Sequence, residues 1–323
     1  MSRLRKGNAL LCLFSAVLFL AGCAAGQREL PEKTVPTGQR GAFRVVAYAP
    51  TYSLERIAPG DYEHVTDVVV FSAELTATGG FCEESAAALP VAYFGAIKQE
   101  HGVRIHLCFG GWGRSRGFAE MTGDPAKRAV FVGTVLQWCL ANSFDGVDYD
   151  WEFPANDAEH AAYGSLLEET AEAFRPHGLR VSVALGHTQS LEQAAYDAVD
   201  AIHLMTYDMG LRHATERDAV SAVRRLLRSG ARSDKIVLGT PFYGRRLDDR
   251  DVAMAYEDIL SRFAPRPDED EAGGFYFNNV ETIRRKTRYA LEHGLAGIMI
   301  WELSMDTDDE TSLLRSIQQE LSK

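Results

Sequence analysis

From Ala42 onward, short runs rich in β-branched residues alternate with longer amphipathic stretches. Such runs are typical of buried strands, and apolar residues recurring with a period of about 3.6 residues indicate helices. One strand followed by one helix, repeated eight times, predicts a parallel sheet that its helical crossovers cover and that closes on itself. The expected fold class is therefore α/β, a (β/α)8 TIM barrel. The eight expected strands are Phe43–Tyr48, Asp67–Ser72, Arg104–Phe109, Gly146–Tyr149, Arg180–Leu185, Ala201–Thr206, Lys235–Thr240 and Gly297–Trp301.

The stretches between these runs supply the helices. The clearest are Pro125–Ala141, Ala158–Phe174, Arg217–Ser229 and Asn279–His293. An open, doubly wound sheet is the structural alternative, but no glycine-rich phosphate loop follows the first run. The pattern predicts a single barrel domain over residues 42–323.

The first 41 residues have a different character. Three basic residues within the first six precede the apolar stretch Ala9–Ala21, which is short for a membrane span and resembles the core of a signal peptide. The stretch runs into Leu20-Ala21-Gly22-Cys23, which resembles the lipobox of bacterial lipoproteins. This likeness implies a cleaved signal peptide over 1–22, a lipid on Cys23, and a flexible tether over 23–41. The protein is then expected to be exported and anchored by lipid to a membrane of the bacterial cell envelope. An ordinary secretory signal is the alternative.

The net charge of the chain argues against nucleic acid as a partner. The formal net charge is −11 over 323 residues, and removal of the three bases of the signal peptide leaves 31 − 45 = −14. A protein without a basic stripe is poorly suited to nucleic acid, so a neutral sugar is the better candidate. A monomer is also expected. Beyond the signal peptide and Cys23, the cysteines are Cys82, Cys108 and Cys139, with no C-x-x-C motif. We expect Cys108 and Cys139 to be buried thiols and predict no disulfide.

The segment around the fourth run carries the strongest chemical signal. Side chains alternate faces along a strand, so Asp148, Asp150 and Glu152 point the same way, into the barrel, and Glu152 comes last, at the C-terminal rim. Three confined carboxyl groups cannot all ionise cheaply, which is how a carboxylic acid remains protonated near neutral pH. We expect Asp148 and Asp150 to share a proton while Glu152 presents one to a leaving group.

Two other interpretations of this acidic run are an exposed acidic strand and a metal site. Bulky residues alternate with the acids, namely Val147, Tyr149 and Trp151, and these belong against helices rather than in solvent. Calcium sites usually come from loops containing Gly and Asn. We therefore expect neither a metal nor another cofactor.

The run Asp145–Glu152 (DGVDYDWE) resembles the D-x-x-D-x-D-x-E signature of glycoside hydrolase family 18, the chitinase family. Three further segments and one aromatic residue resemble family positions in the same order. They are Cys108-Phe109-Gly110-Gly111, with Cys108 in place of the family serine, Met205-Thr206-Tyr207-Asp208, Gly239–Arg245 and Trp301.

The resemblance implies a retaining, substrate-assisted hydrolysis of β-1,4 linkages in N-acetylglucosamine-containing glycans such as chitin and chito-oligosaccharides. Glu152 would protonate the glycosidic oxygen while the substrate's own acetamido oxygen attacks, giving an oxazolinium intermediate. Asp150 would stabilise the charge on the acetamido group, Asp148 would share its proton with Asp150, and Tyr207 would hold the acetamido oxygen. The alternatives are an endo-β-N-acetylglucosaminidase acting on N-glycans, a hydrolase of cell-wall glycan, and a non-catalytic lectin.

The resemblance also implies a set of substrate-binding residues: Tyr48, Phe71, Gly111, Trp112, Met205, Asp208, Tyr243, Arg245 and Trp301. Between the seventh and eighth runs, the expected helix Val252–Phe263 leaves no room for the α+β insertion that deepens the cleft in many processive chitinases. We therefore expect a shallow groove and short or internally cleaved substrates. In the same region Gly273–Asn279 is either a loop with exposed aromatics or a packed hairpin.

Overall fold

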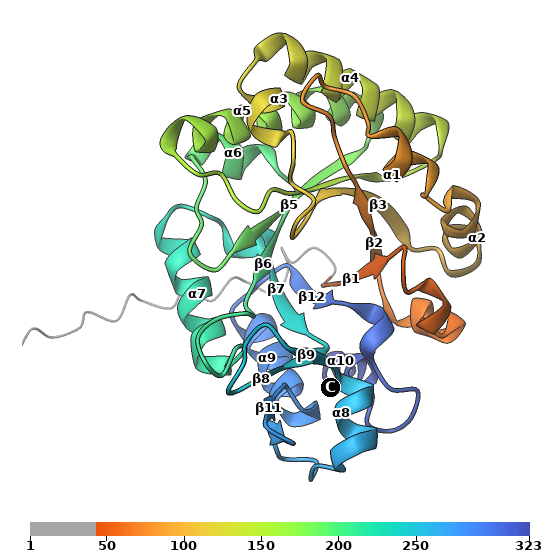
Figure 1. Ribbon diagram of the computed structural model, residues 1–323, viewed down its shortest axis with the longest axis vertical. Coiled ribbons are helices and arrows are strands. Elements are labelled where there is room, and N and C mark those ends of the chain that lie inside the picture. The colour runs from red at the N-terminus through yellow and green to blue at the C-terminus, as the bar shows by residue number, and fades with distance from the viewer. Residues whose placement is uncertain (1–42) are drawn as a thin grey trace, which may run out of the picture. The chain divides into compact units, whose positions relative to one another are not determined.

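The computed structural model describes residues 43–323, in which eight parallel strands form a closed barrel (Figure 1). The strands follow one another around the barrel in the order β1-β12-β7-β6-β5-β4-β3-β2. Their bounds are β1 Arg44–Pro50, β2 Asp67–Ala73, β3 Arg104–Gly110, β4 Gly146–Asp150, β5 Arg180–Gly186, β6 Ala201–Met205, β7 Ile236–Pro241 and β12 Gly297–Trp301. The predicted barrel and all eight of its strands are confirmed. The predicted signal peptide, lipidated Cys23 and tether lie outside the described residues.

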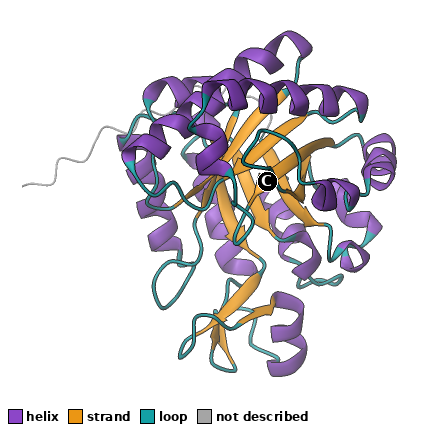
Figure 2. Cartoon of the chain, turned by 45° about the horizontal axis from the view of Figure 1, so that its top comes forward, coloured by secondary structure: helices purple, strands orange, loops and turns teal. Residues whose placement is uncertain are grey.

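Helices surround the barrel and cover its outer face (Figure 2). Within residues 43–323 they are α1 Glu83–Ala87, α2 Val91–His101, α3 Phe118–Thr122, α4 Pro125–Ala141, α5 Asp157–Phe174, α6 Gln193–Ala198, α7 Glu216–Arg228, α8 Tyr256–Phe263, α9 Val280–Glu292 and α10 Leu313–Leu321. The long helices begin where a side chain accepts a hydrogen bond from the first turn, as Asp124 does for α4 and Asn156 for α5. None of these helices is long and apolar enough to cross a membrane.

The alternation along β4 is confirmed in the packing. Val147, Tyr149 and Trp151 belong to the buried cluster between barrel and helices, where Trp151 stacks on Phe118 of α3 with ring centroids 5.3 Å apart. A second buried cluster fills the barrel itself and includes Tyr48, Phe71, Cys108, Tyr207 and Met299. Because the bulky residues of β4 are held outside, its acids are directed inward.

A small antiparallel sheet follows β7, with strand order β10-β11-β8-β9. Its strands are β8 Tyr243–Arg246, β9 Ala253–Ala255, β10 Glu271–Ala272 and β11 Phe275–Tyr276, and α8 comes between β9 and β10 (Figure 1). The expectation that this segment has no room for an α+β insertion therefore needs correction. Strands of two to four residues suffice here because hairpins pair them directly and α8 covers them.

The Gly273–Asn279 segment is the packed hairpin of the two alternatives. Phe275, Tyr276 and Phe277 are all buried rather than exposed. Phe275 stacks on Phe263 of α8 at 6.2 Å, which shows how the helix and the hairpin hold each other.

Two glycines provide a test of barrel closure. A Cβ on Gly146, at the start of β4, would lie 2.1 Å from the carbonyl oxygen of Arg180 in the neighbouring strand. We expect Gly146→Ala to lower the free energy of unfolding by about 1–3 kcal/mol, because backbone must move to admit the methyl group. Gly133→Ala, at an exposed position of α4 where nothing lies within 4 Å, should instead raise it by about 0.5–1 kcal/mol. Urea unfolding measures both, and equal effects would contradict this account.

Candidate active site

Three carboxyl groups at the end of β4 form the centre of the site. Asp148 is fully buried, Asp150 is 3% exposed, and Glu152 is half-buried at the rim. We call these three residues the acid file. Their common direction into the barrel is confirmed, and their exposure increases toward the C-terminal end, where barrel active sites form.

Asp148, the deepest acid, is surrounded by donors. Tyr48 donates its hydroxyl proton to Oδ2 at 2.7 Å, Ser182 donates to Oδ1 at 2.6 Å, and His203 Nδ1 lies 3.1 Å from Oδ1. Burial favours the neutral acid, but His203 and the two hydroxyl donors outweigh it and lower the pKa of Asp148. Asp148 is therefore held as a carboxylate.

Asp150 has the opposite environment. Its Oδ1 is buried and has no hydrogen-bond partner among the described residues. Burial, together with the negative charges of Glu152 and Asp148, raises the pKa of Asp150 well above its ordinary value. Within residues 43–323 no hydrogen bond joins Asp148 to Asp150. Donors from other strands already satisfy Asp148, and the sharing of a proton between these two acids stays a prediction.

Glu152 has the properties of a general acid. Burial and the negative charge of Asp208 raise its pKa to about 7, and the backbone amide of Trp112 offsets part of that effect. The backbone N–H of Glu152 donates to Ser115 Oγ at 3.0 Å, which fixes the chain at the rim. A carboxyl group whose pKa lies near neutral pH can give a proton and later take one back.

An aromatic hydroxyl and an ion pair lie at the end of β6, which only β5 separates from β4 in the barrel. Tyr207, just beyond β6, is buried, and burial raises the pKa of its hydroxyl well above the ordinary value, so it remains a neutral donor. The next residue, Asp208, receives two hydrogen bonds from Arg245 of β8, each at 2.8 Å. His213 Nδ1 lies 3.4 Å from Asp208 Oδ1. Tyr243 packs against Tyr207 with ring centroids 6.2 Å apart.

Aromatic side chains from the ends of the other strands line the interior beside the acid file. The Trp301 ring lies edge to face with the Phe71 ring, with the ring centroids 4.7 Å apart. The centroids of Trp301 and Tyr48 are 5.5 Å apart. Gly111 passes so close that a Cβ would lie 2.3 Å from the Phe71 ring, and its φ of +100° favours glycine. Trp301 keeps part of its surface exposed, as a residue that stacks on a ligand must.

The remaining predicted binding residues differ in how far they are exposed. Met205 is half-buried against the inner cluster, whereas Trp112 is 80% exposed at the rim. Tyr48 is 1% exposed, and its hydroxyl is directed to Asp148, so it supports the acid file from below. The sequence prediction missed His203 and Ser182. Alternation along β6, the signal that located the acids on β4, places His203 on the same inward face as Met205.

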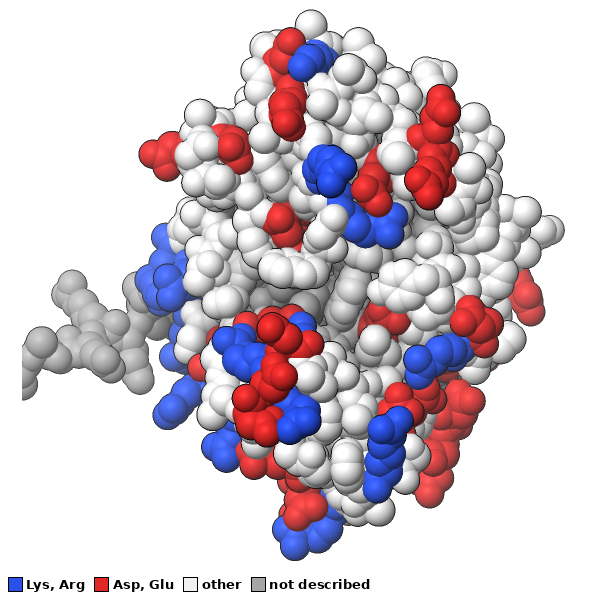
Figure 3. Space-filling model, in the orientation of Figure 1, with Lys and Arg blue, Asp and Glu red and all other residues white. Residues whose placement is uncertain are grey.

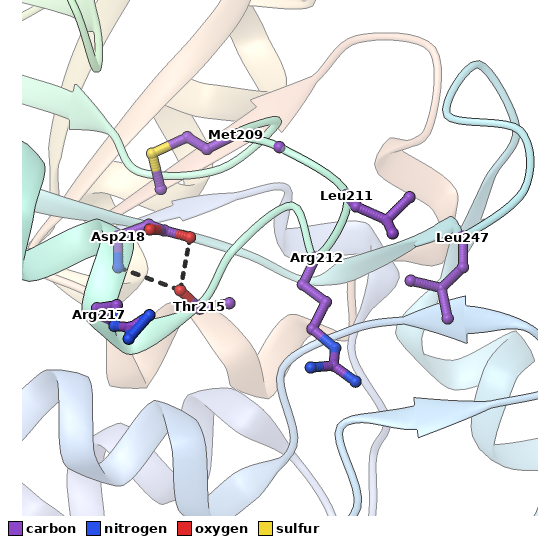
Figure 4. A pocket seen from close by; sticks show the side chains of 8 residues that line it. Met209, Leu211, Arg212, Thr215, Arg217, Asp218 and Leu247 are labelled. Atoms are coloured by element: carbon purple, nitrogen blue, oxygen red, sulfur yellow. Dashed lines mark hydrogen bonds between the residues drawn. The ribbon is translucent and has the colours of Figure 1, made fainter.

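The face drawn in Figure 3 is hollowed near its centre. One cavity of about 590 Å³ lies along the β6–α7 loop, and its lining includes Met209, the residue after Asp208 (Figure 4). It is lined by Met209, Gly210, Leu211, Arg212, Thr215, Arg217, Asp218 and Leu247. None of the three acids lines it, so it borders the site rather than holding the reacting groups. Within residues 43–323 there is no group of three His, Cys, Asp or Glu residues arranged to hold a metal ion.

Comparison with known proteins places the chain among enzymes of glycan breakdown. The model of the glycosyl hydrolases family 18 matches residues 44–306. Probable chitinase 2 of Drosophila melanogaster is 26% identical, and the match covers 66% of this chain and 58% of that protein. Chitotriosidase-1 of Mus musculus is 24% identical, with 67% of this chain and 62% of that protein covered. The chain thus spans about 60% of the length of these curated relatives.

Solved structures share the fold. A chitinase from Bacteroides thetaiotaomicron matches with a TM-score of 0.79 at 22% identity, covering 87% of this chain and 96% of that one. A plant class V chitinase mutant from Cycas revoluta, in complex with (GlcNAc)3, matches with a TM-score of 0.75 at 19% identity, covering 86% and 99% of the two chains.

The charge of Asp208 provides a test of how the acidity of Glu152 is set. We expect Asp208→Asn to lower the pKa of Glu152 from about 7, since the substitution removes a negative charge that favours the protonated form. Carbon-13 NMR titration of the Glu152 carboxyl group measures the change directly. Asp218→Asn, on α7, is the matched control and should leave the titration unchanged. A Glu152 titration unaffected by Asp208→Asn would show that burial alone sets this acidity.

Proposed function

This chain belongs to family 18 of the glycosyl hydrolases, and we propose that it is a retaining glycosidase that cleaves β-1,4 linkages in chitin or chito-oligosaccharides. The feature that supports this most directly is the graded acid file, in which the pKa of Asp148 is lowered by its donors, the pKa of Asp150 is raised by burial, and the pKa of Glu152 is raised to about 7. Glu152 then has both the acidity to protonate a leaving oxygen and a position at the rim, whereas Asp148 and Asp150 are buried below it.

In the proposed reaction, Glu152 gives its proton to the glycosidic oxygen while the acetamido oxygen of the sugar attacks the anomeric carbon. The C–O bond to the leaving sugar breaks and an oxazolinium ion forms. Water then attacks the anomeric carbon, Glu152 takes one of its protons, and the acetamido group is restored with retention of configuration. The acid form of Glu152 is available below about pH 7 and is lost above it.

Two neighbours of Glu152 suit the acetamido group. Asp150 lies between Asp148 and Glu152, and its buried Oδ1 has no hydrogen-bond partner among the described residues, so the carboxyl group can turn toward the substrate and accept the acetamido N–H. Tyr207 remains a neutral hydroxyl donor and can hold the acetamido oxygen in line with the anomeric carbon. A sugar without the acetamido group lacks the nucleophile, so cellulose and starch should be inert.

Sugar rings would stack on Trp301, whose position against Phe71 and Tyr48 fixes its plane. The exposed rings of Trp112 and Phe153 extend the apolar surface at the rim. The binding of (GlcNAc)3 by the related plant chitinase supports an N-acetylglucosamine oligomer as the ligand here as well.

Hydrolysis of fluorogenic chitobiose and chitotriose glycosides tests the proposal. Glu152→Gln should lower kcat by about 10²- to 10⁴-fold, because the variant cannot donate a proton. Glu168→Gln, exposed on α5, is the control and should match the wild type. The corresponding cellobiose glycoside should remain intact.

Unchanged turnover by Glu152→Gln would refute this mechanism. If the wild type cleaves neither chito-oligosaccharide, N-glycans and peptidoglycan fragments come next, and cleavage of either would reassign the substrate. Binding of chito-oligosaccharides without any hydrolysis would identify a lectin.

We further propose that the protein is exported and anchored by a lipid on Cys23, which would retain the enzyme at the bacterial cell envelope. The likeness of Leu20-Ala21-Gly22-Cys23 to a lipobox supports this. Several acyl chains on one residue give durable attachment, whereas one gives only marginal binding.

Metabolic labelling with radioactive palmitate in a bacterial host tests the anchor. The wild-type chain should carry label and sediment with membranes, whereas Cys23→Ser should carry none. Cys12→Ser changes the other cysteine of the leader and should remain labelled. An unlabelled, freely secreted wild-type protein would indicate an ordinary secretory signal instead.

A further inference from the structure

His203 lies in the interior of the barrel, directly below the acid file, and no step of the proposed reaction uses it. The imidazole is 2% exposed. Its Nδ1 lies 3.1 Å from Asp148 Oδ1 and 3.0 Å from the hydroxyl oxygen of Tyr48. The Tyr48 ring meets the imidazole edge to face at 5.8 Å, which fixes the plane of both rings.

The contacts determine where the hydrogen on this nitrogen must be. Tyr48 has a single hydroxyl hydrogen, and the 2.7 Å contact with Asp148 Oδ2 uses it. The 3.0 Å contact between Tyr48 and Nδ1 therefore needs a hydrogen on the nitrogen. The reverse arrangement, with Tyr48 donating to Nδ1, would leave the lone pairs of Nδ1 and Asp148 Oδ1 facing each other at 3.1 Å. Nδ1–H is thus the donor, shared between Tyr48 and Asp148.

The other groups around Asp148 and His203 do not replace this donor. Cys108, where the family has serine, presents a thiol to Asp148, and burial with the nearby acids raises its pKa, so it remains a weak neutral donor. Ser182 is neutral. Below His203 a cavity of about 10 Å³, room for about one water, is also lined by two bases, two acids and one histidine. These are Arg44, Arg180, Asp67, Asp200 and His106.

We propose that His203 is a positioning residue whose Nδ1–H holds Asp148 as an anion, so that the protons of the acid file reside on Asp150 and Glu152. Asp148 then needs no proton from Asp150, and Asp150 is free to face the substrate. The effect on turnover rests on the proposed function, whereas the hydrogen on Nδ1 does not.

Nitrogen-15 NMR of the histidine rings in the wild-type protein tests the geometry without any substrate. The His203 Nδ1 resonance, assigned by its loss in His203→Asn, should show a directly bonded hydrogen throughout the range in which the protein is folded. Asp148→Asn should shift this resonance. A His203 ring with its hydrogen only on Nε2 would overturn the proposal, even if the enzyme proved inactive on every glycan.

Kinetics test the consequence for turnover. His203→Leu should lower kcat by about 10- to 100-fold with little change in KM, since a hydrogen bond to a buried charge is lost. It should also move the pH profile of kcat, because the protons of the file are redistributed. His203→Asn, whose amide replaces the Nδ1–H donor, should remain within about threefold of the wild type.

Two further variants distinguish a positioning role of His203 from a general loss of barrel structure. His106→Leu removes the other buried histidine of the barrel interior, which contacts Asp67 at 3.0 Å rather than the acid file, and should leave the pH profile unmoved. Combining His203→Leu with Asp148→Asn should cost little more than Asp148→Asn alone, because the two residues act through one contact. Fully additive losses, or an equal pH shift in His106→Leu, would contradict the proposal. Inactivity of the wild type itself would count against the proposed function alone.

Discussion

A carboxylate placed in the interior of a barrel is stable only where the surrounding walls supply donors. Asp148 meets that condition with Tyr48 from β1, Ser182 from β5 and His203 from β6, each at hydrogen-bonding distance. β5 and β6 follow β4 along the chain and lie next to one another in the sheet, whereas Tyr48, 100 residues from Asp148 in the sequence, is brought to it by the closed barrel. The charge of one buried acid thus depends on the register of the whole barrel, and the acidity of the two acids above it depends in turn on that charge.

The charge on Asp148 is one reason why the three acids of the file differ in pKa. Asp150 is buried beside Glu152 and Asp148 and has no partner for Oδ1, so its pKa is raised well above the ordinary value. Glu152 is partly solvated and responds to Asp208, whose own charge is stabilised by Arg245. Three chemically similar side chains on one strand therefore differ in protonation because of what the other strands present to each of them.

Much of this could be predicted from the sequence. Period-two alternation alone directs Asp148, Asp150 and Glu152 into the barrel and Trp151 out of it, and the eight strands follow from β-branched runs at regular intervals. The donors to Asp148 are harder to predict, since whether Tyr48 faces ligand or acid depends on the stagger between strands. The small sheet was missed because strands as short as Glu271–Ala272 and Phe275–Tyr276 carry no periodicity of their own. Whether Asp148 or Asp150 keeps the proton depends on contacts across the barrel, which local sequence does not encode.

The small sheet after β7 also contributes to the electrostatics of the site. Arg245 reaches from β8 to Asp208, and Asp208 in turn acts on the acidity of Glu152. The segment between β7 and α9 is joined to the barrel at its two ends, so its loops can change in length and composition while the barrel remains as it is. Substitutions in this small sheet would therefore shift the working pH through Asp208 without any change to the acids of β4.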